Sequence, residues 1–248
     1  MALGILLALF IGISLGLLGG GGSILTVPIL RYAVGLDTHQ AIAVSLFVVG
    51  VTSASGMIQH ARLGHVQWCN GLLFSIGAMA GAYAGGRLGT QIPGNLLLIL
   101  FAGLMVLTAI VMLRKDGEAA VPNTAKIRWL PLILEGLAVG IFTGMVGAGG
   151  GFLVVPALVL LAGQPMRSAI GTSLLVIALK SFAGLAGYLT GIAIDWQVAL
   201  LVTGAAVLGS FGGARLARLW PPDRLRIAFA WFTLLMAVLI LAKEIPWL

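Results

Sequence analysis

The chain matches itself without a gap when it is shifted by 128 residues. Residues 16–28 (GLLGGGGSILTVP) then lie on residues 144–156 (GMVGAGGGFLVVP). Shared apolar composition produces scattered Leu or Ala matches, but it does not align less common residues in one register. Such matches pair Trp68 with Trp196, Arg87 with Arg215 and Pro93 with Pro221. The sequence is therefore a duplicated unit, and any fold must accommodate two copies of it.

The apolar runs of both copies are too long and too continuous for a soluble protein. Hydrophobic residues make up 60% of the chain and charged residues 8%, against about 25% charged in a typical soluble domain. One helical membrane span needs roughly 20 apolar residues. The sequence predicts an all-α polytopic protein of the cell (plasma or inner) membrane. It leaves no room for a large soluble sensor or ATPase domain, and the continuous runs argue against a β-barrel.

Each copy divides in the same way, into a glycine-broken apolar hairpin and three fuller spans. The hairpin segments are 3–18 with 23–35, and 130–146 with 152–162. The fuller spans are 38–59, 69–90, 94–113, 166–189, 196–217 and 223–242. We therefore expect a first repeat at 1–113, a polar linker at 114–128 and a second repeat at 129–248.

The distribution of Lys and Arg distinguishes inverted from parallel repeats. If each glycine-broken pair doubles back, the repeats are inverted, and the charged linker 114–128 lies in the cytoplasm. Ten basic residues then lie inside and only Arg31, Arg87 and Lys243 lie outside, whereas parallel repeats give six against seven. Cytoplasmic loops carry the excess of Lys and Arg. The charge pattern therefore predicts inverted repeats with both termini outside.

Two glycine runs lead directly into the short apolar segments. Gly20, Gly21 and Gly22 precede Ser23, and Gly149, Gly150 and Gly151 precede Phe152. Glycine lets the backbone approach a ligand closely, and a helix N-terminus with free N–H groups binds anions. Short, glycine-interrupted segments at matching positions of two halves also point to a transporter's substrate site. The runs predict an anion site near the membrane midplane, although small residues also serve close helix packing.

Four polar residues within the spans are further candidates for this site. Ser45, Thr172 and Ser173 could add hydroxyl donors, or could bond only to their own helix backbone. Lys180 is the one charge deep within a span, where a lysine is costly and is a functional hypothesis by default. Its counterpart in the first copy is Thr52, so any role is asymmetric. Snorkelling or structural pairing is the alternative for Lys180.

Four other residues could serve the mouths of the pathway or the coupling. Arg87 and Arg215 occupy equivalent positions and would attract anions at opposite faces, or anchor the helices at the interface. Glu135 could be a proton-coupling carboxylate or lie near the interface, and Gln59 lies near the end of its span. A proton or a counter-anion could couple transport, and the sequence leaves direction and oligomeric state open.

The sequence shows no catalytic constellation. The glycine runs lack the Lys-Ser/Thr of a phosphate-binding loop, and the single cysteine, Cys69, excludes cysteine-rich metal sites. We expect no catalytic residues, no metal and no cofactor. The net charge of +7 comes from residues in short loops, so it indicates topology rather than a nucleic-acid partner.

The two copies of one motif resemble a known family. Val27-Pro28 and Val155-Pro156 end the glycine-rich segments, and residues 41–46 (AIAVSL) and 169–174 (AIGTSL) follow. This pattern resembles the TauE/SafE sulfite exporter family, also called the TSUP family, over essentially the whole chain. The first copy departs from the second, because Ala43-Val44 stands where the second has Gly171-Thr172.

The resemblance implies a secondary carrier of sulfur-containing anions such as sulfite, thiosulfate, sulfoacetate or other organosulfonates. Together with the glycine runs it predicts a small anion held between two helix N-termini. Alternating access would come from rocking of the two halves. The partners are then the anion and the lipid bilayer. The alternatives are an anion channel or a carrier of another anion such as a carboxylate, and, more remotely, a membrane scaffold or an intramembrane enzyme.

Overall fold

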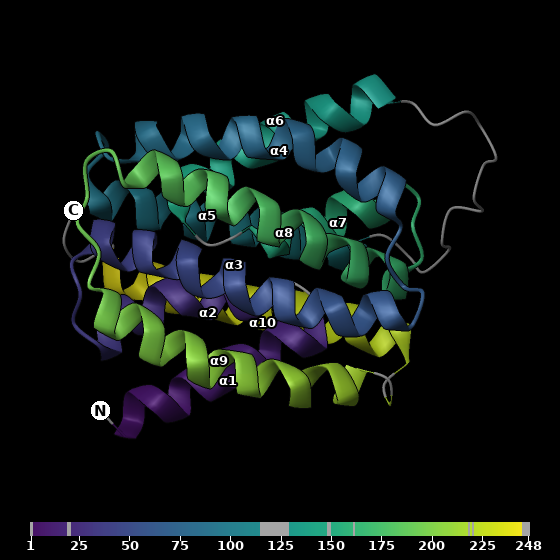
Figure 1. Ribbon diagram of the computed structural model, residues 1–248, viewed down its shortest axis with the longest axis horizontal. Coiled ribbons are helices and arrows are strands. Elements are labelled where there is room, and N and C mark those ends of the chain that lie inside the picture. Colours follow the sequence, from purple (N-terminus) through teal and green to yellow (C-terminus); the bar gives the residue numbers. More distant parts are fainter. Residues whose placement is uncertain are drawn as a thin grey trace.

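The computed structural model describes residues 2–18, 21–114, 129–147, 150–160, 162–217, 219 and 221–244, and these residues are helical with short connections (Figure 1). The first repeat contains α1 (Ala2–Leu18), α2 (Gly21–Pro28), the π-helix η1 (Ile29–Ala33), α3 (Thr38–Arg62), α4 (Trp68–Gly89) and α5 (Gly94–Arg114). The second contains α6 (Trp129–Val146), α7 (Gly151–Leu160), α8 (Met166–Tyr188), α9 (Trp196–Ala217) and α10 (Pro222–Glu244). The five α-helices of one repeat correspond in order to those of the other. Of the expected linker, residues 115–128 lie outside the described residues.

Six helices are long and apolar enough to cross a membrane. They are α3, α5, α6, α8, α9 and α10. α2 has 8 residues and α7 has 10, so at 1.5 Å per residue they reach only about 12 Å and about 15 Å. Neither can cross a core of about 30 Å. Large apolar side chains on the outside, such as Leu134, Leu200 and Trp231, are more than half exposed, as expected where lipid is the solvent. The described residues are thus all-helical, as expected, with six candidate membrane spans; α6 is among these six, and the expected span 69–90 (α4) is not.

The first short helix continues after its proline as a π-helix. Pro28 closes α2 and has no N–H to donate to the preceding turn. Immediately after it, the Val34 N–H donates to the Ile29 carbonyl oxygen five residues back, at 3.1 Å. The chain therefore turns out of the short helix without a tight turn before α3 begins.

Glycine seams join helices of different repeats. On α4, Gly77, Gly81 and Gly85 face the backbone of α6, and a Cβ atom at any of them would collide with an α6 carbonyl oxygen. The facing positions of α6 are also glycines, namely Gly136, Gly140 and Gly144. Small residues four apart let membrane helices approach closely. The packing role expected for most glycines is therefore the one the structure shows here.

An equivalent seam joins α1 to α9. A Cβ atom at Gly12 would collide with the Ala206 carbonyl oxygen, and one at Gly209 or Gly213 would collide with the backbone of α1. α4 also packs on α8, and α9 also packs on α3. The helices thus form two bundles that exchange α4 and α9 between the repeats. We call them the α1/α3/α9 bundle and the α4/α6/α8 bundle, and Figure 1 shows one below the other.

This exchange bears on the expectation that the two sequence halves rock as units, because it packs the halves together through α4 and α9. α4 belongs to the first half, yet its main contacts are with α6 and α8 of the second, and α9 likewise packs on α1 and α3 of the first. A motion of one sequence half against the other would pull both glycine seams apart. α3 packs on α8 at least as extensively as on α9, so the two bundles are also joined to each other at their centre.

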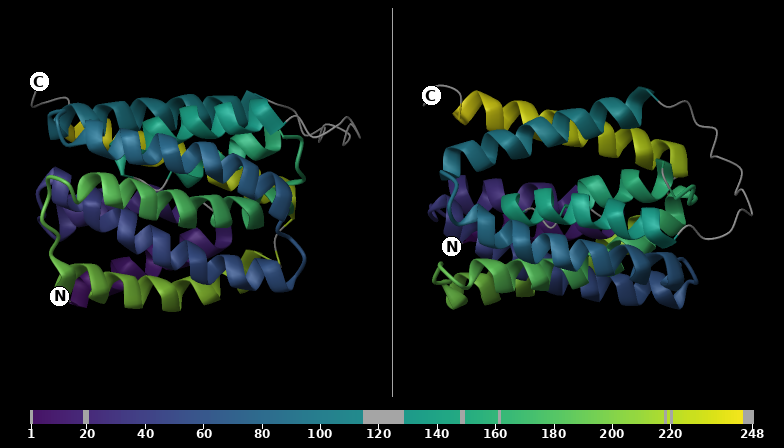
Figure 2. Two further views of the ribbon diagram at one scale, coloured as in Figure 1. Left: turned by 45° about the horizontal axis from the view of Figure 1, so that its top comes forward. Right: turned by 90° about the horizontal axis from the view of Figure 1, so that it is seen from above.

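α3 and α8 form the contact between the bundles. Leu46 lies beside Gly184, Gly50 lies under the Phe182 ring, and Gly56 lies beside Leu174. Residues further along α3 thus contact residues earlier in α8, so the two helices run antiparallel. These two helices are also the most enclosed of the six candidate membrane spans. In the most apolar stretch of α3, 67% of the residues are buried, and in that of α8, 78% are. In the other four candidate spans at most 44% are buried. α3 and α8 therefore form the centre of the protein (Figure 2).

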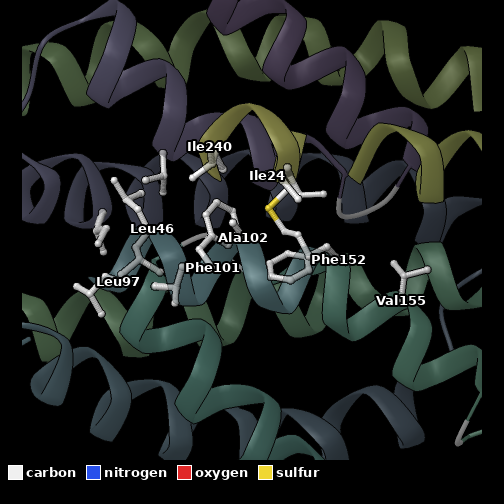
Figure 3. Close-up of a cluster of buried hydrophobic side chains, with 14 of the residues drawn as sticks. Ile24, Leu46, Leu97, Phe101, Ala102, Phe152, Val155 and Ile240 are labelled. Carbon is white, nitrogen blue, oxygen red and sulfur yellow. The ribbon is translucent and has the colours of Figure 1, made fainter. Parts of the chain in front are cut away.

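The short helices α2 and α7 lie in the core, covered by α5 and α10. Ile24 of α2 and Phe152 of α7 belong to one buried cluster with Phe101 and Ala102 of α5 and Ile240 of α10 (Figure 3). The rings of Phe101 and Phe152 lie 5.4 Å apart at their centroids. The glycine-broken segments are thus enclosed by protein, as irregular backbone at membrane depth must be.

Candidate functional site

The second glycine run forms a break between α6 and α7. Gly147 follows α6 with φ +72° and Gly150 precedes α7 with φ +56°, a left-handed conformation that favours glycine. The Gly150 carbonyl oxygen accepts from the Leu153 and Val154 N–H groups at 3.0 Å each, which starts α7. Gly150 thus adopts a backbone conformation that residues with a side chain rarely take. Gly149 lies outside the described residues.

Lys180 reaches this break from α8. Its side chain is 1% exposed, and Nζ donates a hydrogen bond of 2.8 Å to Thr143 Oγ1 of α6. A Cβ atom built on Gly150 would lie 2.5 Å from Nζ, so the ammonium group lies against the start of α7. Three segments that are distant in sequence thus meet here. We call Thr143, Gly150 and Lys180 the lysine site.

The lysine site has a cation without a matching acid. No ion pair involves Lys180 in the part of the chain that the structure describes. The group to which its Nζ donates a hydrogen bond is a neutral hydroxyl. Burying a charge costs several kcal/mol unless it is paired. The N–H groups in the first turn of a helix add partial positive charge at the same place. The arrangement is suited to a small anion.

The first glycine run is chemically different. Gly22 packs against Ile11 and Leu15 of α1, and Leu15 is the counterpart of Thr143 in the other repeat. Thr52, the counterpart of Lys180, donates to its own helix at Val48 O, at 2.6 Å. Among the described residues, the two expected glycine sites are therefore not equivalent, since the second combines glycine with a cation and the first does not.

The three hydroxyl candidates have different roles. Ser45 Oγ donates to the carbonyl oxygens of Ile42 and of Gly147, so it reaches the α6–α7 break from α3. Ser173 Oγ donates to Ile170 O of its own helix, at 2.8 Å. Thr172 Oγ1 accepts from the Gln67 N–H at 3.0 Å and so supports the start of α4. Among the hydrogen bonds of the described residues, Ser45 is the one of the three that bonds to a glycine break.

The remaining residues of the expected site belong to the two short helices. Gly21 begins α2, Ser23 is fully buried within α2, Gly151 begins α7, and Phe152 packs on Phe101. Gly20 lies outside the described residues.

The four expected mouth or coupling residues lie apart from the lysine site. Arg87 and Arg215 are exposed in the last turns of α4 and α9. Glu135 is partly buried on α6, about two turns before Thr143. Gln59, near the end of α3, has a buried Nε2 with no partner among the described residues. Within those residues no cluster of three or more His, Cys, Asp or Glu could hold a metal ion.

Thr143 is the residue that the sequence analysis missed. It lies in an apolar span, where a threonine usually bonds to its own backbone, and it does donate to Gly140 O at 3.3 Å. A comparison of the two copies could have indicated Thr143. The second copy has Thr143 where the first has Leu15, and Lys180 where the first has Thr52. Two polar replacements in one repeat point to a site in that repeat.

The whole chain has relatives among known proteins. A family profile described as sulfite exporter TauE/SafE matches residues 4–240. A probable membrane transporter protein of Xylella fastidiosa (strain 9a5c) is 37% identical over 209 residues, which cover 82% of this chain and 79% of that protein. The probable membrane transporter protein YdhB of Bacillus subtilis (strain 168) is 29% identical over 228 residues, covering 90% and 93%. No solved structure matches the chain.

Proposed function

Because the chain belongs to the TauE/SafE sulfite exporter family of membrane transporters, we propose that it is a secondary transporter of a small sulfur-containing anion. Sulfite, thiosulfate and organosulfonates are the substrates we propose. The observation that carries the proposal is the buried ammonium group of Lys180, which lies at the start of α7 and bonds to a neutral hydroxyl. An anion bound there would supply the missing countercharge.

The chemistry of the lysine site favours an oxyanion. An ammonium group has three N–H donors, of which one goes to Thr143. The first turn of α7 presents further N–H groups. Several donors converging on one place match an anion with several acceptor oxygens, such as sulfite or a sulfonate. The family description, sulfite exporter, points the same way.

We propose that the two repeats are inverted and that the two bundles alternate in access. The antiparallel packing of α3 on α8, which are equivalent helices, supports inversion. So do the ends of the chain, because α1 begins and α10 ends at the left of Figure 1, whereas α5 ends and α6 begins at the right. Rocking of one bundle against the other at the α3–α8 contact would leave both glycine seams closed. The linker 114–128 would be cytoplasmic and both termini outside.

Labelling of paired cysteines tests the inverted arrangement. Gln91 and Leu219 are equivalent, exposed residues in the turns after α4 and α9, so inversion places them on opposite sides of the membrane. In a Cys69→Ala background, an impermeant thiol reagent should label Gln91→Cys in intact cells and Leu219→Cys only after permeabilisation. Labelling of both from one side would contradict inversion and support parallel repeats.

Thermal unfolding of detergent-purified protein with a panel of ligands tests the substrate. At 100 times its Kd, an anion that binds only the folded protein should stabilise it by about 2.7 kcal/mol. We expect this shift with sulfite, thiosulfate or an organosulfonate at constant pH and ionic strength, and not with small carboxylates or cations. Stabilisation by carboxylates alone would exclude the sulfur assignment. Gradient-driven accumulation in liposomes then distinguishes a carrier from a channel.

A pair of glycine variants locates the binding in the same assay. A Cβ atom at Gly150 would collide with the Thr143 side chain and lie 2.5 Å from Lys180 Nζ, so it would fill the lysine site, whereas at Gly163, which also has a positive φ of +64°, nothing lies within 4 Å. Both alanine variants carry similar backbone strain. Gly150→Ala should therefore lose the anion-induced shift and Gly163→Ala should keep it. Equal shifts in both variants would place the anion elsewhere.

A further inference from the structure

Two fully buried serines occupy equivalent positions in the two repeats. Ser53 of α3 and Ser181 of α8 are separated by 128 residues and are both 0% exposed. In the part of the chain that the structure describes, the hydroxyl oxygen of neither has a partner. Other buried hydroxyls bond to their own helix, such as Thr52 to Val48 O and Ser75 to Gly71 O. Because Ser53 and Ser181 are equivalent and both differ from these hydroxyls in the same way, one common role would explain both.

Both serines lie on the contact between the two bundles. On α3, Leu46, Gly50 and Gly56 contact α8. Ser53 is three residues from both Gly50 and Gly56, and residues three apart lie on the same face of a helix. On α8, Leu174 and Gly184 contact α3, and Ser181 occupies the position between them equivalent to that of Ser53. One hydroxyl from each bundle is thus directed to the α3–α8 contact.

Lys180 lies at the level of this contact along α8, although its side chain reaches Thr143 and Gly150 on the other side of the helix. Gly50 lies at the level of Phe182, and Gly56 lies at the level of Leu174. Thr52 and Lys180, which precede the two serines, therefore lie at nearly the same level, midway along both helices. The cation and the two hydroxyls occupy one layer of the protein. In an alternating-access carrier, this layer between the moving bundles is where substrate must be held.

A buried hydroxyl without a partner is unfavourable by about 1–3 kcal/mol, and most such groups in proteins are satisfied. A neutral hydroxyl can donate to an anion without adding charge, so it complements an ammonium group that supplies the charge. A halide needs no directed pair of donors, whereas an anion with three or four oxygens can accept from several groups at once.

We propose that Ser53 and Ser181 are substrate-binding residues, which donate one hydrogen bond from each bundle to a multi-oxygen anion whose charge is balanced by Lys180. This deepens the proposed function and rests on it. It assigns the preference for an oxyanion over a halide to these hydroxyls. It also means that the substrate bridges the two bundles at α3 and α8, rather than lying within one repeat.

Alanine substitution tests the pair, because alanine keeps the small size that close packing requires and removes only the hydroxyl. We expect Ser53→Ala and Ser181→Ala each to raise the Kd for sulfite or thiosulfate by about tenfold or more, measured by titration of purified protein. The Kd for chloride should not change. The melting temperature without ligand should stay the same or rise, since a buried unsatisfied group is removed. Ser75→Ala, which removes a hydroxyl bonded to its own helix, is the matched control.

The outcomes separate this inference from the proposed function. If wild-type protein binds sulfite or thiosulfate and both alanine variants bind as tightly, the serines are packing residues and the inference is wrong, while the proposed function stands. If only one variant is weakened, the pairing is wrong. If the wild type binds no sulfur oxyanion, the proposed function itself fails. Should an alanine variant not fold, Ser53→Cys and Ser181→Cys replace it, because a thiol is a weaker donor and should shift the Kd in the same direction.

Discussion

Lys180→Met should raise the Kd for sulfite or thiosulfate by about 30-fold or more. Removing one partner of a buried, hydrogen-bonded charge pair costs about 2–5 kcal/mol, and each 1.4 kcal/mol is about tenfold in affinity. Methionine has a similar length and no charge, so the surrounding packing changes little. Titration of the purified protein with each anion measures the effect.

The same variant should be at least as stable as wild type when no ligand is present. A buried charge without a countercharge opposes folding, and Lys180 pairs with no carboxylate in the described part of the chain. Loss of binding together with an unchanged or raised melting temperature is a combination that a structural lysine would not produce. If Lys180 served structure alone, Lys180→Met would melt earlier and bind as before.

Lys243→Met is the matched control for the loss of one positive charge. Lys243 is exposed at the end of α10, where Nζ lies 4.4 Å from the centroid of the Tyr32 ring. Its removal changes the net charge by the same amount as Lys180→Met. We expect no change in anion affinity. Equal weakening by both variants would show that general electrostatic attraction, rather than the lysine site, determines binding.

The helices and the repeat could be derived from the sequence because both depend on local patterns. Apolar runs of about 20 residues define spans wherever lipid is the solvent, and the glycine runs mark the breaks at α1–α2 and α6–α7. The expected span 38–59 became α3 at Thr38–Arg62, and the expected span 166–189 became α8 at Met166–Tyr188. Lengths of this kind follow from composition alone.

The exchange of α4 and α9 could not be derived in this way. Glycines at spacing four on α4 indicate a close neighbour, but they do not say which helix it is. Gly81 faces Leu137 of the other repeat, and nothing near residue 81 in the sequence indicates that partner. Packing partners are a long-range property, so the sequence alone could not show which helices of the two halves pack together.

The different hydrogen-bond partners of the candidate hydroxyl residues could not be derived from the sequence either. Thr172 and Ser45 are both hydroxyl residues near the start of a span, yet one supports the start of α4 and the other reaches Gly147. Side-chain direction on a helix decides which neighbour each residue meets. A sequence supplies candidates for such a site, and the packing of α3, α6 and α8 selects among them.

Gly213→Ala and Gly212→Ala should have opposite effects on stability, although the two residues are adjacent on α9. A Cβ atom at Gly213 would collide with the Ile13 carbonyl oxygen of α1, whereas nothing lies within 4 Å of one at Gly212. Overpacking costs about 1–3 kcal/mol, so Gly213→Ala should lower the melting temperature. Gly212→Ala removes backbone freedom from the unfolded chain and should leave stability unchanged or raise it by up to about 1 kcal/mol.

The shape of the unfolding curve for Gly213→Ala tests the exchange of helices as well. The seam at Gly213 joins α9 of the second repeat to α1 of the first. The other seam joins α4 of the first repeat to α6 of the second. Neither repeat can then separate while the other stays folded. We expect one cooperative transition in both variants, shifted down as a whole in Gly213→Ala. Two separable transitions, of which only one moves, would show that the repeats fold independently and that the seams do not connect them.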